Sequence, residues 1–345
     1  MNQVLYQLKQ KSESRNLCTK IRLSIGTAIV LGLAQGRLDV EPTTAYLMTY
    51  TQDKCTANCA FCPQAREAKS SAELLSRVTW PIFPTAEVLS ALENGFSQGK
   101  ISRVCIQALN YPEVFAHVEA LVKEIKKQAE VPLSVSCQPI GRANIELLAK
   151  AGVDRIGVAL DAATEGVFNR VKGEGAGGPY RWDLQFRYLA EALEVFGRGK
   201  VSTHVVIGLG ETEKEATETI QRCMNMGVLP ALFSFTPVRG TPLEKKTPPH
   251  LEVYRRIQLA RYLIVEGLAQ ASGMQFDGEG RIVGFGLPKD ALEEAVNSGE
   301  PFRTSGCLSC NRPFYNEKPS GPIYNYARKP SREEIEEIEK QFKLS

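Results

Sequence analysis

The sequence lacks segments of the kind that span a membrane or follow a nucleic-acid backbone. Its longest apolar segment, Leu23 to Ala34, lies between Arg22 and Arg37 and falls short of the ~20 apolar residues that a bilayer requires. Ser24 and Thr27 interrupt this segment, and its position behind a polar, charged start is not typical of a secretory signal. The formal charge of +3 is spread along the chain, without basic runs interleaved with aromatic residues. We therefore expect neither a membrane span nor a nucleic-acid partner.

Low-complexity tracts are also missing from the sequence. A chain of 345 residues with 43% hydrophobic and 23% charged residues can bury a substantial core, and β/α barrels of this length commonly form one domain. The nine cysteines are an odd number with two metal-like spacings, which fits a reduced compartment better than a disulfide framework. We expect a cytoplasmic protein with one main domain and small appendages.

Three cysteines lie close together in the loop that runs from Lys54 to Pro63. Cys55, Cys59 and Cys62 are spaced so that their thiolates can converge on one inorganic centre. Zinc is one alternative, but a structural zinc site closes with four ligands and no further Cys or His lies nearby. Three unrelated thiols are another alternative. A 4Fe-4S cube offers four iron corners, so three cysteines would leave one iron open to a small molecule.

This spacing, with the aromatic residue Phe61 directly before the last cysteine, resembles the radical S-adenosylmethionine (SAM) superfamily. The resemblance implies that Cys55, Cys59 and Cys62 hold a 4Fe-4S cluster whose open iron chelates the amino and carboxylate groups of SAM. Reductive cleavage then yields methionine and a 5'-deoxyadenosyl radical. Phe61 is expected to lie beside the cofactor.

From Thr44 onward, strand-like and helical patterns alternate. Runs rich in β-branched residues predict strands at 44–49, 102–108, 133–137, 155–160, 201–208 and 231–237. Amphipathic patterns predict helices between and after them, at 86–96, 114–128, 144–151, 184–196, 213–226 and 251–266. Six successive β/α units imply an α/β fold with a parallel sheet and right-handed crossovers, to which residues 275–286 could add a strand or two. The family resemblance likewise implies a TIM-type barrel, partial to full.

The chain is expected to have three regions. We expect an N-terminal helical extension over residues 1–43 and the barrel over residues 44–299. Residues 300–345 are expected to form a cluster-binding tail with a final helix. Residues 300–330 are rich in Pro, Gly, Asn and Tyr with little periodicity, which indicates an ordered loop. Ser331 and Glu334 form a capping box for the final, charged helix, which we expect to be a solvated face.

Residues at the ends of later strands are candidates for holding the cofactor, because the chemistry of a parallel barrel lies at the carboxyl ends of its strands. Asp161 ends the fourth strand, where the resemblance implies a carboxylate on the ribose hydroxyls. The alternative is a helix N-cap for the segment at Thr164. Gly208, Gly210 and Glu211 follow the fifth strand in a pattern similar to that of the family.

Roughly residues 45–310 resemble biotin synthase. Cys105 on the second strand and Cys137 on the third look like the positions of two auxiliary-cluster cysteines in that family, although a single strand cysteine is more often a small buried hydrophobe. The other two ligands of biotin synthase would fall at Ser202 and near Phe276. A 2Fe-2S centre of the biotin synthase kind is therefore not expected.

The tail contains a second cysteine motif. Cys307 and Cys310 are separated by two residues, a spacing that lets both thiolates reach one metal centre. With Cys105 and Cys137 they make four thiolates, the complement of a second 4Fe-4S cluster. A rival interpretation has the pair holding zinc or forming a redox dithiol, with the two strand cysteines inert.

Four other residues have weaker assignments. Arg239 follows the sixth strand and could pair with a carboxylate of the cofactor or substrate, or lie on the surface. His204 shares strand parity with Ser202 and so points into the barrel, where a hydrogen-bonded core histidine is the common case. Cys18 and Cys223 are left as structural thiols.

Two clusters across a barrel mouth suggest that one activates an unactivated C–H bond and the other donates sulfide. Biotin synthase and lipoyl synthase share this logic, and the ligand set and tail look most like the two-protein (archaeal-type) lipoyl synthases. The resemblance implies a radical SAM sulfurtransferase that converts a protein-bound octanoyl group into lipoyl. It also implies three partners: an octanoylated carrier (a lipoyl domain or glycine-cleavage H protein), a second related radical SAM protein, and an electron donor such as ferredoxin or flavodoxin.

Two other functions remain open at this point. One is a biotin synthase-like or other radical SAM reaction in which the second cluster is not a sulfur donor. The other is a non-catalytic iron-sulfur or zinc scaffold, for which an open iron would serve no purpose.

Overall fold

A computed structural model describes residues 17–138 and 141–341, which form an eight-stranded sheet in the order β10-β9-β8-β7-β6-β2-β1-β5. The strands of this sheet are β1 (Lys20–Leu23), β2 (Thr44–Thr49), β5 (Ile82–Pro84), β6 (Arg103–Gln107), β7 (Leu133–Cys137), β8 (Arg155–Val158), β9 (Val201–Ile207) and β10 (Leu229–Ser234). Strands β2 and β6 to β10 pair in parallel, whereas β1 is antiparallel to both β2 and β5. The predicted parallel sheet is confirmed, and it forms a partial barrel in which β10 is an edge strand.

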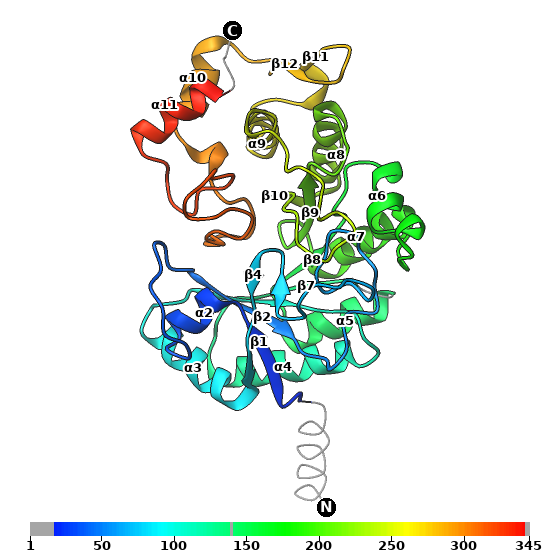
Figure 1. The fold of residues 1–345 in the computed structure, drawn as a ribbon, viewed down its shortest axis with the longest axis vertical. Helices are drawn as coiled ribbons and strands as arrows, with labels where there is room; N and C mark the ends of the chain where they lie inside the picture. The colour runs from blue at the N-terminus through cyan, green and yellow to red at the C-terminus, as the bar shows by residue number, and fades with distance from the viewer. Residues whose placement is uncertain (1–16, 139–140, 342–345) are drawn as a thin grey trace, which may run out of the picture.

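Six predicted helices surround the sheet, as Figure 1 shows. They are α3 (Thr85–Ser97), α4 (Val114–Gln128), α5 (Arg142–Ala151), α7 (Trp182–Phe196), α8 (Glu213–Met226) and α9 (Leu251–Val265). Strand residues such as Leu47, Ile106 and Ile156 are fully buried in the layer beneath these helices. Because side chains alternate along a strand, their neighbours point to the inner face. Tyr46 and Cys105, for example, belong to a separate inner cluster.

The region before β2 differs from the predicted helical extension. Its described part holds the short helix α2 (Ile25–Val30) but begins with β1, which joins the main sheet. Ile21 and Leu23 are 3% and 0% exposed, because a strand between β2 and β5 buries both against the helical layer. The remainder of the predicted extension, residues 1–16, lies outside the described residues.

Several short elements escaped prediction because each is too short for a clear periodicity. They are β3 (Leu74–Leu75), β4 (Val78–Thr79), α6 (Glu165–Val171), η1 (Glu174–Ala176), η2 (Ala271–Gly273), α10 (Lys289–Asn297) and η3 (Glu300–Phe302). The strand or two expected within 275–286 are present as β11 (Gln275–Phe276) and β12 (Ile282–Gly284), which pair with each other in a separate sheet.

The final helix, α11 (Arg332–Gln341), begins with the predicted capping box. The backbone N–H of Glu334 donates to Ser331 Oγ at 3.3 Å, and the N–H of Ser331 donates to the Glu334 carboxylate at 2.7 Å. The expected solvated helix is wrong in one respect, since Ile335 and Ile338 are buried. They form an apolar stripe, three residues apart, that packs among α9 and α10.

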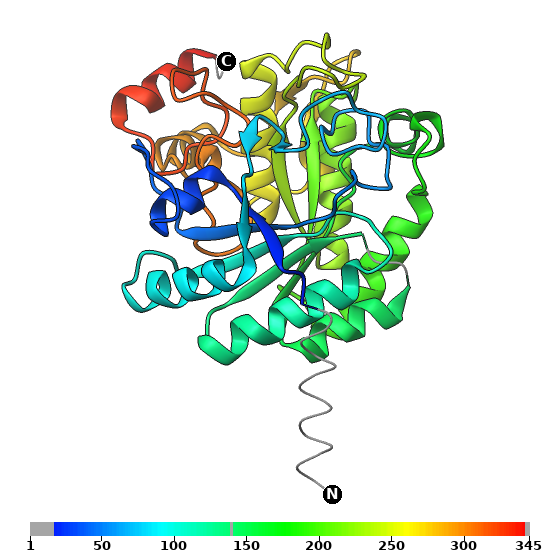
Figure 2. The same ribbon diagram turned by 60° about the horizontal axis from the view of Figure 1, so that its bottom comes forward.

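The tail fills the open side of the barrel. In Figures 1 and 2 the orange segment lies between the blue N-terminal elements and yellow α9. Ser305 Oγ accepts the N–H of Leu232 on edge strand β10 at 2.7 Å, while the Asn311 side chain bonds the backbone of Thr43 and Glu41 beside β2. The tail therefore links the two sides of the barrel that strands leave unjoined. No helix within the described ranges is long and apolar enough to cross a bilayer.

Candidate active site

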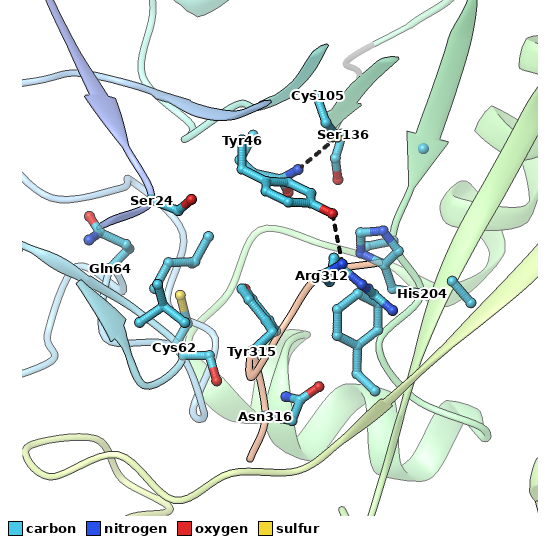
Figure 3. Close-up of a pocket in the computed structure, with 18 of the residues that line it drawn as sticks. Ser24, Tyr46, Cys62, Gln64, Cys105, Ser136, His204, Arg312, Tyr315 and Asn316 are labelled. Atoms are coloured by element: carbon cyan, nitrogen blue, oxygen red, sulfur yellow. Dashed lines mark hydrogen bonds between the residues drawn. The ribbon is translucent and has the colours of Figure 1, made fainter. Parts of the chain in front are cut away.

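A cavity of about 530 Å³ occupies the interior of the barrel and is open to its mouth. This size is ordinary for a small-molecule site. Both predicted groups of cysteines contribute to its lining. Figure 3 shows Tyr46, Arg312 and Tyr315 around the space between Cys62 and Cys105.

The loop cysteines form the first group. Cys55, Cys59 and Cys62 all line the cavity, and Phe61 lines it beside them as predicted. Burial raises the pKa of each thiol, to about 12 for Cys62, and the neighbouring thiols raise the pKa of Cys59 and Cys62 further. Three buried thiols with raised pKa values need a cationic centre to become thiolates.

Hydrogen bonds fix the shape of this loop. The half-buried Lys54 donates its ammonium to the carbonyls of Pro63, Ala68 and Ser70 at 2.9, 2.6 and 2.7 Å. The Gln64 side chain donates to two further carbonyls of the same segment. These bonds hold the backbone between the first cysteine and β3 in one conformation, so the three thiols are positioned before any ligand binds.

Asp161 lies at the cavity in a conformation that few residues adopt. Its φ of 64° is left-handed, a region that is costly for most side chains and tolerated by Asp. The carboxylate pairs with the buried ammonium of Lys172 at 2.7 Å, and it raises the pKa of Cys59 and Cys62 beyond the effect of burial. The predicted carboxylate therefore does face the cluster loop. The alternative role is taken by Thr164, which itself caps α6.

Lys172 is a residue that the sequence did not single out. Its side chain is 1% exposed, lies 5.0 Å over the ring of Tyr180 and opposes the burial effect on the pKa of Cys55 and Cys59. A lysine in a surface-type helical segment gives no signal of this in the sequence. The fold alone brings it beneath the cysteine loop, because α6 returns the chain towards β8.

The chemistry of these donors fits a 4Fe-4S cluster. Cys55 Sγ accepts the N–H of Asn110 at 3.2 Å, and backbone donors also reach Cys62. Such bonds to sulfur, together with the nearby ammonium, suit anionic cluster thiolates. Within the described residues, no three His, Cys, Asp or Glu side chains form a site for one metal ion. A cube is larger than a single ion and uses thiols spread around its corners.

A second group of three cysteines lies deeper in the same cavity. Burial raises the pKa of Cys105, and the neighbouring thiols of Cys307 and Cys310 raise it further, whereas Arg103 and Arg312 lower it. The tail CxxC motif thus folds back onto β6, as predicted.

Cys137 does not join this group, and its predicted place in a four-thiolate set is wrong. Its side chain is 4% exposed on the same face of β7 as Leu133 and Val135, among residues packed beneath the helices. Burial alone raises the pKa of Cys137, to about 12. Strand alternation explains the difference, since Ser134 and Ser136 take the inward positions of β7. Cys137 is among the residues that line the cavity, but no neighbouring thiol acts on its pKa.

The other predicted cofactor residues lie away from the cavity lining. Gly208 and Gly210 adopt φ of 105° and 126°, which their glycine identity permits. The Glu211 carboxylate accepts backbone N–H groups of Gly208 and Leu209, so it stabilises its own loop. Arg239 is exposed, which matches the surface alternative. Their predicted contact with SAM finds no support in the cavity lining.

His204 lines the cavity from β9, as its strand parity predicted. Burial lowers its pKa to about 4, and Arg312 lowers it as well, against an opposing effect of Asp161. The imidazole is therefore neutral at pH 7. Arg312 stacks 3.8 Å above the ring of Phe233 and places a fixed positive charge between the tail and the barrel.

Comparison with known sequences agrees with this site. Residues 49–223 match the family model described as "Radical SAM superfamily". The biotin synthase of Buchnera aphidicola subsp. Acyrthosiphon pisum (strain APS) is 24% identical over 249 residues, 68% of this chain and 67% of that protein. The biotin synthase of Persephonella marina is 23% identical over 197 residues, 55% of this chain. The chain spans about half the length of several of these relatives, 54% in the Persephonella case.

Solved structures share the fold. Methylornithine synthase (PylB) superposes with a TM-score of 0.51 at 12% identity, over 65% of this chain and 63% of that one. The hydrogenase maturase HydG superposes with a TM-score of 0.53 at 13% identity, over 73% and 54%. The family match covers half of the chain and includes the three-cysteine loop, and the biotin synthases are its sequence relatives. The chain is a biotin synthase-related member of the radical SAM superfamily.

Proposed function

We propose that this protein is a radical SAM sulfurtransferase of the lipoyl synthase type. It would insert sulfur into a protein-bound octanoyl chain, with an auxiliary 4Fe-4S cluster as the sulfur source. The observation that carries this proposal is the presence of two separate three-cysteine groups on one cavity. The names of the biotin synthase relatives point to the same class of reaction, since biotin formation also places sulfur into a saturated chain.

When bound, SAM on a reduced 4Fe-4S cluster would supply the radical that removes a hydrogen atom from an unactivated C–H bond, and a second cluster would supply sulfide. The chain itself positions these groups and excludes water. Cys55, Cys59 and Cys62 would hold the first cluster, with Lys172 and Asp161 beneath it. Cys105 and the tail CxxC would hold the second.

The lining between the two cysteine groups suits an aliphatic substrate. Trp80 and Leu109 are buried there, with Leu75 and Val78 of the β3–β4 hairpin packed against them. An apolar wall of this kind stabilises a saturated acyl chain and offers little to a charged one. The neutral His204 is consistent with such an environment.

The partners follow from the same proposal. The octanoyl group would arrive on a carrier of the lipoyl-domain or glycine-cleavage H protein type. A second, related radical SAM protein would share the two sulfur insertions, and a ferredoxin or flavodoxin would supply electrons. Because each carbon needs its own hydrogen abstraction, two sulfurs require two equivalents of SAM and two electrons from the reductant.

Iron and sulfide analysis of anaerobically reconstituted protein tests the second cluster. Two 4Fe-4S clusters correspond to about eight irons per chain, and the double variant Cys307→Ala/Cys310→Ala should keep about half. Cys18→Ala is the matched control and should keep all of them, because Cys18 lies by Tyr50, outside both groups. A double variant with full iron content would refute the assignment.

Mass spectrometry of the carrier tests the reaction. Octanoylated carrier is incubated with SAM, reductant and the partner enzyme, and a carrier bearing added sulfur is expected. Cleavage of SAM without any sulfurated carrier would favour the other open function, a radical SAM enzyme whose second cluster does not donate sulfur.

A further inference from the structure

A second loop packs against the outside of the three-cysteine loop. It covers residues 238–246, after β10, and in Figure 2 this yellow loop lies beside the blue three-cysteine loop. The N–H of Leu243 donates to the carbonyl of Ala60, within the three-cysteine loop, at 3.3 Å. Further along, the N–H of Lys69 donates to the carbonyl of Gly240 at 2.7 Å. Backbone contacts at two points therefore hold the two loops together.

The contact at Gly240 depends on the residue being glycine. Gly240 has a φ of 84°, and a Cβ at this position would lie 2.6 Å from the backbone nitrogen of Ser70, so another residue would separate the loops. Ser70 Oγ also donates to the carbonyl of Arg239 at 2.6 Å. Arg239 and Lys69 are thereby fixed side by side on the outer surface.

Positive charge without partners gathers on this surface. The group consists of Lys69, Arg239, Lys245 and Lys246, which we call the cationic patch. The first three are exposed and the fourth is half-buried. Among residues 17–138 and 141–341, no side chain forms an ion pair or a hydrogen bond with any of the four side chains. The nearest acids in sequence are engaged elsewhere: Glu67 pairs with Arg66 at 2.9 Å, and Glu244 accepts the N–H of Gly240 at 2.7 Å.

The cationic patch lies behind the three-cysteine loop and not at the cavity opening. Of the described residues that line the cavity, none belongs to the patch. Leu243 packs with Ala60 and Phe61 in one apolar cluster, which joins the patch to the cysteines. A carrier that delivers an acyl chain must place that chain in the cavity, whereas an electron carrier needs only to approach the first cysteine group. The position of the patch favours the electron carrier.

We propose that the cationic patch is the docking surface for a small acidic protein that carries one electron. Exposed, unpaired cations attract an acidic surface over long range and align it. The docked protein is oxidised by one electron, which is consumed when the carbon–sulfur bond of SAM breaks to give methionine and the 5'-deoxyadenosyl radical. The inference rests on the electron donor in the proposed function and does not require sulfur insertion.

The test compares Lys69→Glu/Arg239→Glu with the wild type, each as the full chain reconstituted anaerobically. The control, Lys100→Glu/Lys200→Glu, makes the same change of charge at exposed residues shortly before β6 and β9. These residues lie at the amino ends of the parallel strands, away from the three-cysteine loop. Formation of 5'-deoxyadenosine is measured with dithionite, a flavodoxin or a ferredoxin as reductant, at low and high salt. Calorimetry measures the affinity for each carrier separately.

We expect Lys69→Glu/Arg239→Glu to lose about tenfold in kcat/KM for the carriers at low salt and to bind them more weakly. High salt should reduce the advantage of the wild type, because it screens exposed charges. The rate with dithionite should be unchanged, since this small ion needs no docking surface. The control variant should match the wild type in every measurement, and Lys245→Glu/Lys246→Glu should repeat the loss.

Two results would overturn the proposal. In the first, both patch variants keep the carrier affinity and kcat/KM of the control. In the second, both lose as much activity with dithionite as with the carriers, so that the cations support the three-cysteine loop itself. Weaker binding of the octanoylated carrier alone would likewise refute an electron-carrier site. The same measurements in the Cys307→Ala/Cys310→Ala background should agree, because docking at the first cysteine group is independent of whether the second group donates sulfur.

Discussion

Lys172 lies where a single charge acts directly on the first cysteine group. Its ammonium is buried beneath the loop and paired with Asp161 at 2.7 Å. A unit charge about 10 Å from a cluster, at an effective dielectric constant of about 20, is worth about 1.7 kcal/mol, or about 70 mV for one electron. Lys172 should therefore make the anionic cluster easier to reduce.

Replacement of this charge gives the first prediction. Lys172→Met should lower the reduction potential of the first cluster by several tens of millivolts, whereas Lys172→Arg should change it little. Potentiometric EPR titration of both variants, in the Cys307→Ala/Cys310→Ala background, measures that cluster alone. Equal potentials in Lys172→Met and the background protein would show that the lysine has only a structural role.

Glu317 is a buried acid in the tail whose protonation changes near neutral pH. Burial raises its pKa to about 7, against the opposing effects of Arg312 and of a backbone hydrogen bond from Asn325. The folded protein thus keeps this proton up to about pH 7, while the unfolded chain releases it near the ordinary value of 4.5. The free energy of unfolding therefore falls as the pH rises from 4.5 through 7, because the unfolded chain ionises this group more readily than the folded protein does.

The second prediction follows from this direction. Glu317→Gln should raise the free energy of unfolding at pH 8 by up to about 3 kcal/mol and have little effect at pH 5. As the control, Glu93→Gln replaces an exposed residue and should leave the free energy of unfolding unchanged at both pH 5 and pH 8. Urea unfolding of the three proteins at the two pH values measures this, and a gain that is the same at pH 5 and pH 8 would contradict a raised pKa.

At the scale of elements, the alternation of side chains along β6 and β7 decides which cysteines meet. The third prediction is that Cys105→Ala reduces the iron content of the reconstituted protein by about half, whereas Cys137→Ala leaves it unchanged. Cys137→Ala should instead cost some stability, because it removes a buried sulfur from the helix-facing core. Loss of iron in Cys137→Ala, measured beside Cys105→Ala, would restore the four-thiolate set.

Helix α9 anchors the tail that carries the other two thiols. The buried guanidinium of Arg255 donates to the carbonyls of Ile323 and Tyr324, and Gln258 donates to Tyr324 as well. Removal of the guanidinium leaves the part-buried Ile323 carbonyl without this donor, at about 1–3 kcal/mol, while the Tyr324 carbonyl keeps its bond from Gln258.

The fourth prediction is that Arg255→Met loosens the tail and empties the second cluster first. Iron should fall from about eight towards about four per chain, and limited proteolysis should cut between residues 306 and 325. Arg328→Met removes a mostly exposed pair with Glu334 and should do neither. Equal loss of both clusters in Arg255→Met would mean that α9 supports the whole barrel and not the tail in particular.

Helices and strands were predicted correctly where their hydrophobic pattern is clear. The direction of a single side chain was predicted wrongly where it depends on the register of the strand. The bounds of β2 and β7 follow from apolar runs and those of α4 and α8 from amphipathic patterns, and the structure has all four elements at the predicted residues. The inward or outward direction of Cys137 depends on where β7 begins, and one residue of offset reverses it. The third strand was predicted correctly, and the function of its cysteine was not.

At the scale of the whole molecule, the three-cysteine loop could be recognised from sequence because all its ligands lie within one short segment. The second group could be recognised only in part, since Cys105 and the tail CxxC are far apart in the chain. Lys172 and Arg312 could not be recognised at all, because their proximity to the thiols arises from the return of α6 to β8 and of the tail to β2. A tail that closes the gap between β10 and β2 also explains why a partial barrel can enclose a cavity.

The central claim is that the tail-bound cluster gives up its sulfur to the substrate chain. It is tested most directly by reconstituting the protein with a heavy sulfur isotope and measuring the carrier by mass spectrometry after one turnover with the partner enzyme. The proposal predicts that heavy sulfur appears in the lipoyl carrier, and that Cys307→Ala/Cys310→Ala transfers none. Sulfurated carrier containing only light sulfur would contradict it.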